Sequence, residues 1–158
     1  MSDAAALPVI RVDATVLGFD VGLRRIGVAV GNGVTGNASA LAVIEVHATG
    51  PDWERIDRLL REWKPAGLVV GDPMTLDGGD QPIRQAARTF ARQLQHRSGL
   101  PVVMVDERNS SQEAARRFAA ARADGRRKRR DAEVLDAIAA AVIVERWLAA
   151  PRDVQLPT

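Results

Sequence analysis

The sequence predicts a single α/β domain with a mixed five-stranded sheet, three antiparallel strands followed by two parallel strands, and helices on both faces. Three observations predict this architecture. The length of 158 residues fits one domain. The first half of the chain alternates apolar and small residues with a period of two, which is typical of strands. The second half alternates short apolar segments with amphipathic segments of helical period, which favours parallel strands joined by crossover helices. The expected element order is βββαβαβαα.

The first three strands are expected to form an antiparallel meander. The segments 16–22 and 25–31 alternate in character and are separated by two residues, which is close to the length of a hairpin turn. A loop rich in glycine and asparagine follows at 32–37, and a third strand is expected at 41–46.

The remaining elements follow from helix boundary residues and apolar runs. Pro51 is expected to begin a helix whose apolar side carries Trp53 and Trp63, and Pro65 to end it. Ser110 and Glu113 form a capping-box pattern that opens a later helix. Residues 1–14 and 151–158 are expected to be flexible tails. The other expected elements are a buried strand at 67–71, a loop at 72–80, a helix at 81–97, a buried strand at 101–105 and a final helix at 131–149.

One face of the first hairpin carries a single acid among glycines. Gly18, Asp20 and Gly22 alternate with larger apolar residues, so they share a face. Glycine in a strand often marks a close approach of a ligand or of another backbone, and an acid there suggests a metal ion or a phosphate-bearing substrate. The alternative is a tightly packed hairpin whose glycines let a helix approach.

Two further acids are candidates for the same site. Glu107 follows the second parallel strand, and ligands of open α/β sheets bind at the carboxyl ends of such strands. Asp136 lies in an otherwise apolar helix, where a carboxylate is costly unless it is paired or binds a metal. Its alternatives are an edge position that reaches solvent or a favourable place near the helix N-terminus. Asp20, Glu107 and Asp136 are expected to converge, and oxygen ligands of this kind select Mg²⁺ or Mn²⁺.

The amino-acid composition excludes several kinds of catalytic and metal site. There is no cysteine, which excludes a disulfide scaffold, thiolate metal sites and a cysteine nucleophile. The histidines at 47 and 96 are far apart, so a Ser-His-Asp hydrolase is not supported. The three tryptophans sit at helix-core spacing and there is no tyrosine, so recognition through the nucleic-acid backbone is favoured over base stacking. No signal peptide and no membrane-spanning run is expected, and the protein is expected to be cytoplasmic.

The segments around Asp20, Glu107 and Asp136, together with the end of the strand at 67–71, resemble the YqgF family, also called RuvX. This family has the ribonuclease-H-like fold of Holliday-junction resolvases. The resemblance implies that Asp20, Glu107 and Asp136 are catalytic and bind Mg²⁺ or Mn²⁺. It also implies a nuclease that matures the 5′ end of pre-16S ribosomal RNA; an older proposal for the family is Holliday-junction resolution. The matching segments are residues 18–22, 25–30, 69–73 with 77–78, 105–108 and 136–143.

Several residues near these motifs are candidate accessory groups. The chain has Asp72 where the family often has leucine, and Ser110 with Ser111 where it often has two threonines. Asp72 is expected either to add an outer ligand to the site or to face away from it. The accessory candidates are Asp72, Asp77, Arg108 and Ser110.

A basic run between the last two helices is the expected substrate clamp. Lysine and arginine supply salt-dependent, sequence-independent affinity for nucleic acid, and the alternative is a solvated loop. The candidates for nucleic-acid binding are Arg126, Arg127, Lys128, Arg129 and Arg130 in the run, and Arg24 and Arg25 beside the first hairpin.

The expected partner is RNA, in particular pre-rRNA, with ribosomal particles as a further partner and branched DNA less favoured. No membrane contact is expected, and the chain is expected to be a monomer or a weak homodimer. One alternative is a non-catalytic nucleic-acid- or ribosome-binding module, against which the three acids argue. Another is an actin-like or sugar-kinase ATPase, which needs two such domains around its nucleotide where this chain has one.

Overall fold

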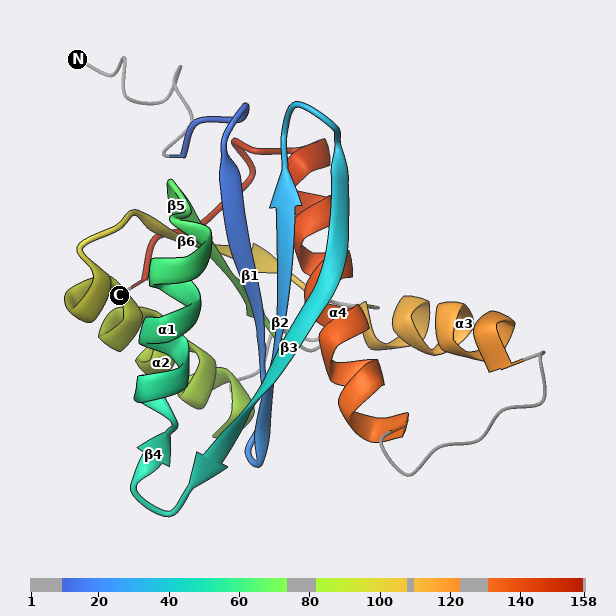
Figure 1. Ribbon diagram of the computed structural model, residues 1–158, viewed down its shortest axis with the longest axis horizontal. Coiled ribbons are helices and arrows are strands. Elements are labelled where there is room, and N and C mark those ends of the chain that lie inside the picture. The colour runs from blue at the N-terminus through green and yellow to red at the C-terminus, as the bar shows by residue number, and fades with distance from the viewer. Residues whose placement is uncertain (1–9, 74–81, 108–109, 123–130, 158) are drawn as a thin grey trace.

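The computed structural model describes residues 10–73, 82–107, 110–122 and 131–157, and within them a mixed six-stranded sheet carries helices on both faces (Figure 1). The strands lie in the order β4-β3-β2-β1-β5-β6. The elements in chain order are β1 (Thr15–Val21), β2 (Arg25–Asn32), β3 (Asn37–His47), β4 (Gly50–Pro51), α1 (Trp53–Trp63), β5 (Gly67–Asp72), α2 (Pro82–Ser98), β6 (Val102–Asp106), α3 (Ser110–Arg122) and α4 (Asp131–Ala149).

The sheet joins an antiparallel meander to a parallel pair. Strand β2 pairs antiparallel with β1 and with β3, and the β2–β3 register shifts between Val28 and Ala29. Strand β5 pairs parallel with β1, and β6 parallel with β5. The carboxyl ends of β1, β5 and β6 therefore meet at one edge of the sheet. The expected mixed α/β architecture is confirmed.

The sixth strand is the main difference from the expected architecture. Strand β4 has only two residues, and they pair with Val46 and His47 at the end of β3. Pro51 therefore belongs to a strand and does not begin the helix. Helix α1 begins at Trp53, after Asp52, whose carboxylate accepts a hydrogen bond from the backbone N–H of Arg55 (3.3 Å).

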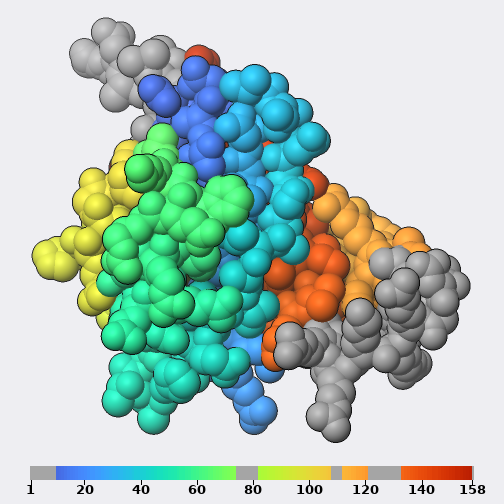
Figure 2. All heavy atoms as spheres, in the orientation of Figure 1, coloured from blue at the N-terminus to red at the C-terminus, as the bar shows by residue number. Residues whose placement is uncertain are grey.

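Two apolar cores lie on opposite faces of the sheet. Leu17 and Phe19 of β1 belong to the core beneath α1 and α2, whereas Val16 belongs to the core beneath α4. This is the alternation that a strand buried on both faces requires. In the space-filling view α4 lies directly against β3, with α3 beyond it (Figure 2). Residues with the parity of Val16, including Asp20, therefore lie on the α4 face.

Ile10 and Gln155, which lie within the two segments expected to be flexible tails, both contact the sheet. Ile10 is buried in the α4-side core, directly over Gly67. Gln155 exchanges two backbone hydrogen bonds with Met104 at the outer edge of β6 (2.7 and 2.9 Å). Burial of Ile10 and the backbone pairing of Gln155 thus attach part of each segment to the sheet. None of the helices described is long and apolar enough to span a membrane.

Helix α3 is attached to α4 by charged groups. The guanidinium of Arg117 donates to Glu113 within α3 (2.9 Å) and to Glu145 of α4 (3.1 Å). Glu113 also forms an ion pair with Arg116. The Glu113 carboxylate, which a capping box would direct to the start of the helix, is thus bound to arginines further along it.

Candidate active site

The glycines of the first hairpin accommodate a helix. A Cβ added at Gly18 would lie 2.2 Å from Cγ2 of Val144, and one added at Gly27 would lie 1.9 Å from the backbone oxygen of Asp136. Helix α4 therefore packs against bare strand backbone, and the helix-packing interpretation of these glycines is confirmed. The same packing brings the one acid of that face, Asp20, next to α4.

Asp20 lies beside Asp136 for a geometric reason. In the β1–β2 ladder Asp20 pairs with Gly27, and the backbone of Asp136 rests on Gly27. Asp20 is half-buried, and its pKa is raised from 3.8 to about 6, with burial as the largest cause. Within this net shift, a hydrogen bond with the side chain of Glu107 lowers the pKa of Asp20 and the negative charge of Asp136 raises it. The three candidate acids thus act on one another.

Glu107 reaches this cluster from the end of β6. The residue is only 8% exposed, and its backbone N–H donates to the carbonyl oxygen of Asp72 (3.1 Å). A Cβ added at Gly71 would lie 2.6 Å from Oε1 of Glu107, so the carboxylate occupies space that Gly71 leaves open. Gly71 was not among the sequence candidates, although a glycine at the end of a buried strand could have indicated such a close approach.

The carboxylate of Asp136 is engaged by an arginine. Oδ2 of Asp136 lies 2.8 Å from Nε of Arg25, and the two side chains are 29% and 31% exposed. This ion pair raises the pKa of Arg25 above its ordinary value, first through the hydrogen bond and then through the charge of Asp136. Arg25 was expected at the substrate, and its pairing with Asp136 was missed. Arg25 and Gly27 lie two residues apart in a strand and therefore share a face. This shared face was the feature of the sequence that could have indicated the pairing of Arg25 with Asp136.

The donor set suits a hard divalent cation, but the arrangement is incomplete. Asp20, Glu107 and Asp136 offer only carboxylate oxygens, which Mg²⁺ and Mn²⁺ prefer. The raised pKa of Asp20 reports burial and a neighbouring negative charge, which a bound cation would offset. Within the described ranges, no three Asp, Glu, His or Cys side chains are yet grouped so as to hold a metal ion. Asp136 is the acid that is held elsewhere, because its carboxylate is bound to Arg25.

Asp72 faces away from these acids. Gly71 faces Glu107 and Ile143 of α4, so the next residue points to the opposite face of β5. There the buried carboxylate of Asp72 accepts two hydrogen bonds from Arg84 of α2. Of the two expectations for Asp72, this arrangement agrees with the one in which Asp72 faces away from the site.

The other sequence candidates are placed only in part. Arg24 is exposed beside the hairpin, and both histidines are exposed. Trp63 is exposed, unlike its expected place in a helix core. Ser110 is the first residue of α3. Asp77, Arg108 and the basic run Arg126, Arg127, Lys128, Arg129 and Arg130 lie outside the described residues.

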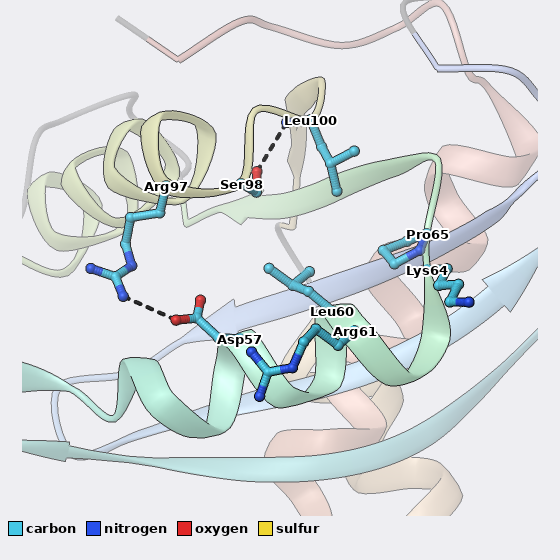
Figure 3. Close-up of a pocket in the computed structure, with 8 residues that line it drawn as sticks. All are labelled: Asp57, Leu60, Arg61, Lys64, Pro65, Arg97, Ser98 and Leu100. Atoms are coloured by element: carbon cyan, nitrogen blue, oxygen red, sulfur yellow. Dashed lines mark hydrogen bonds and ion pairs between the residues drawn. The ribbon is translucent and has the colours of Figure 1, made fainter.

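A basic hollow lies on the opposite face of the sheet from the acids. It measures about 420 Å³ and lies between the C-terminal ends of α1 and α2 (Figure 3). Arg61 and Lys64 line it from the α1 side, and Arg97 reaches from α2 to Asp57 (3.1 Å). Because α1 and α2 cover the face that carries Leu17 and Phe19, this hollow is separated by the sheet from Asp20.

The sheet order, with α4 packed across β1 and β2, is that of a ribonuclease-H-like fold. The fold resembles RuvC of Thermus thermophilus in complex with a Holliday junction, with a TM-score of 0.53, 18% identity, and coverage of 90% of this chain and 99% of that chain. It also resembles the fowlpox virus resolvase bound to junction DNA, with a TM-score of 0.51, 13% identity, and coverage of 85% and 98%. At these identities the likeness shows the fold alone.

Sequence comparison identifies the family. The profile described as "RuvX: Holliday junction resolvase" matches residues 14–150. A protein of Xanthomonas campestris pv. campestris named "Putative pre-16S rRNA nuclease" is 67% identical over 147 residues, which are 93% of this chain and 95% of the relative. A relative of the same name from Xanthomonas axonopodis pv. citri is 68% identical over 142 residues, 90% of this chain and 92% of the relative. The chain belongs to the RuvX family.

Proposed function

We propose that this protein is a nuclease that hydrolyses RNA phosphodiester bonds in the maturation of the 5′ end of pre-16S rRNA. The name of the Xanthomonas relatives supports the substrate, and membership of the RuvX family supports the activity. The observation that carries the proposal is the cluster at the sheet edge, where Asp20 and Glu107 share a hydrogen bond and the charge of Asp136 acts on Asp20.

We assign Asp20, Glu107 and Asp136 as the residues that would hold Mg²⁺ or Mn²⁺. Bound there, the ion would supply Lewis-acid stabilisation of the phosphodiester and a lowered pKa of attacking water. Asp20 and Glu107 are positioned by the ends of two strands, and Asp136 by a helix whose backbone rests on Gly27. These elements fix the backbone positions of the three acids, so only the side chain of Asp136 would have to leave Arg25 for a cation to be bound by all three.

The chain also needs groups that hold the substrate. We assign this role to the basic residues 126–130 and to Arg24, which can neutralise phosphates without reading sequence. The proposed partners are pre-rRNA and ribosomal particles containing it, and the proposed working form is a monomer or weak homodimer. A protein that processes rRNA precursors in a bacterium works in the cytoplasm, where we place it.

The test is a nuclease assay on a pre-16S leader RNA with the variants Asp20→Asn, Glu107→Gln and Asp136→Asn. Each should abolish Mn²⁺-dependent cleavage while circular dichroism shows a folded protein. The surface variant Glu62→Gln, an exposed acid of α1, is the matched control and should cleave normally. Undiminished cleavage by any of the three variants would remove that residue from the mechanism.

A second candidate activity is cleavage of four-way DNA junctions. The description of the matching family profile favours it. A junction substrate in the same assay decides between the two, since the proposal expects faster cleavage of the leader RNA than of the junction.

A further inference from the structure

The ion pair between Arg25 and Asp136 has a consequence for cation and substrate binding. We propose that Arg25 is a positioning residue that holds Asp136 until a divalent cation takes this carboxylate, and that the released guanidinium then binds a substrate phosphate. This inference rests on the proposed function, because it requires that Asp136 join Asp20 and Glu107 around a cation.

The backbone of Asp136 is fixed, so only its side chain can change partner. Its carbonyl oxygen lies only 1.9 Å from the position that a Cβ of Gly27 would take, which leaves the helix no room to move closer to the sheet. Gly27 is in turn the ladder partner of Asp20. A rotation about the side-chain bonds of Asp136, without any shift of α4, is therefore the available route from Arg25 to the other two acids.

Arg25 has a fixed backbone and a movable head. It is the first residue of β2, and its carbonyl oxygen accepts a hydrogen bond from the N–H of Gly22 across the hairpin (2.9 Å). Its side chain is 31% exposed, so the guanidinium borders solvent. Glu45, its partner on β3, and Glu133, one turn before Asp136, also act electrostatically on it. These acids keep the released guanidinium beside the site instead of letting it move away into solvent.

The guanidinium and a divalent cation compete for Asp136. Both are positive, and the charge of Arg25 disfavours a second cation a few ångströms away. Replacing Arg25 by a neutral residue should therefore strengthen cation binding. Conversely, cation binding should free the planar donor fork of Arg25, which suits phosphate. Since coupling between two ligands is reciprocal, RNA affinity should depend on the cation through Arg25.

The first experiment titrates Mn²⁺ alone into the protein and measures the dissociation constant by calorimetry or by the spin-resonance signal of free Mn²⁺. Arg25→Gln should bind Mn²⁺ about tenfold more tightly than the natural protein. Arg25→Lys, which keeps the charge, should show a smaller gain. The exposed neighbour Arg24→Gln, a matched loss of one charge, should change the constant less than about twofold. An unchanged or weaker affinity in Arg25→Gln overturns the proposal.

The second experiment measures binding of a labelled leader RNA by fluorescence anisotropy, in EDTA and in Ca²⁺. The factor by which Ca²⁺ tightens RNA binding should be reduced in Arg25→Gln and retained in the control Arg58→Gln, which removes an exposed arginine of α1 on the other face of the sheet. An equal factor in both variants overturns the phosphate role.

Asp20→Asn separates this inference from the proposed function. If Asp20→Asn leaves the Mn²⁺ affinity of the protein unchanged, the cation site itself is wrong, and both the proposed function and this inference fail. If Asp20→Asn weakens Mn²⁺ binding and Arg25→Gln does not strengthen it, only the inference fails.

Discussion

Asp72 and Arg84 form a buried, two-bonded ion pair between β5 and α2. Nε of Arg84 lies 2.9 Å from Oδ1 of Asp72, and Nη2 lies 3.3 Å from Oδ2. Their side chains are 3% and 9% exposed. The pair lies on the face of β5 opposite Gly71, and hence opposite the carboxylate of Glu107. An acid that the sequence places beside the site therefore fastens the helix on the other face of the sheet.

Removing one partner of this pair should destabilise the fold. Asp72→Leu leaves the Arg84 charge buried without this carboxylate, which should cost about 3 kcal/mol or more of unfolding free energy in urea titrations. The double variant Asp72→Leu with Arg84→Met removes both charges and should recover part of this loss. Cleavage per folded molecule should stay normal in the double variant. A specific loss of metal-dependent cleavage would instead restore Asp72 as an accessory ligand.

The raised pKa of Asp20 predicts a pH dependence of stability in metal-free protein. Because the pKa is about 6 in the folded chain and 3.8 for an unperturbed aspartate, the folded state holds the proton more tightly. The contribution of Asp20 to the unfolding free energy is therefore fully present below pH 3.8 and is lost as the pH rises through about 6. Asp20→Asn should therefore be more stable than the natural protein by about 3 kcal/mol at pH 7.5 in EDTA.

The advantage of Asp20→Asn should disappear at pH 4, where the natural aspartic acid is largely protonated in the fold. Urea titrations at both pH values, with Glu62→Gln as the surface control, measure the difference. An advantage that is the same at both values would contradict a raised pKa.

Two glycine substitutions should differ in whether they can be rescued. Gly27→Ala places a methyl group on the backbone of α4, and Gly18→Ala places one on the side chain of Val144. Each should lower the unfolding free energy by about 2 kcal/mol or more. Val144→Ala should restore part of the stability of Gly18→Ala and none of that of Gly27→Ala. Thermal denaturation of the single and double variants measures this, and rescue of both glycine variants would contradict the close backbone contact at Gly27.

The salt dependence of RNA binding should distinguish the two basic regions. Replacing Arg126 and Arg127 by glutamine should reduce the slope of log affinity against log salt by about 0.7 to 0.9 for each phosphate that is no longer neutralised. Arg61→Gln with Lys64→Gln removes two charges from the hollow of Figure 3, across the sheet from the acids, and is the matched control. Equal effects of the two pairs would argue against a clamp in the basic run.

Much of the fold could be predicted because its strands and helices have strong periodicity. The alternation along β1 and β2 and the apolar runs of β5 and β6 each correspond to an observed strand. Strand β4 could not be predicted, because two residues are too few to show an alternating pattern. Its pairing with His47 also depends on how the chain turns back in three dimensions. The start of α1 was misplaced because Pro51 and Asp52 are both common at helix starts, and the Asp52 cap determines the boundary.

The sequence indicated which acids belong to the candidate site, but not which side chains they pair with. Asp20, Glu107 and Asp136 were identified by residue type and position, and whether they act together as metal ligands stays a prediction. The partner of Asp136 is 111 residues away at Arg25, a tertiary contact that local pattern cannot reveal. The direction of Asp72 likewise depends on which face of β5 meets α2.

The pairing of Gln155 with Met104 gives the end of the chain a protective role. Strand β6 is the last strand of the sheet, and an outer strand with open N–H and C=O groups is a template for joining another chain. The terminal segment satisfies the N–H and C=O of Met104 from within the same molecule. Cutting the chain after Ala149 would uncover this border, so a shortened protein should self-associate through β6 at concentrations where the full chain does not.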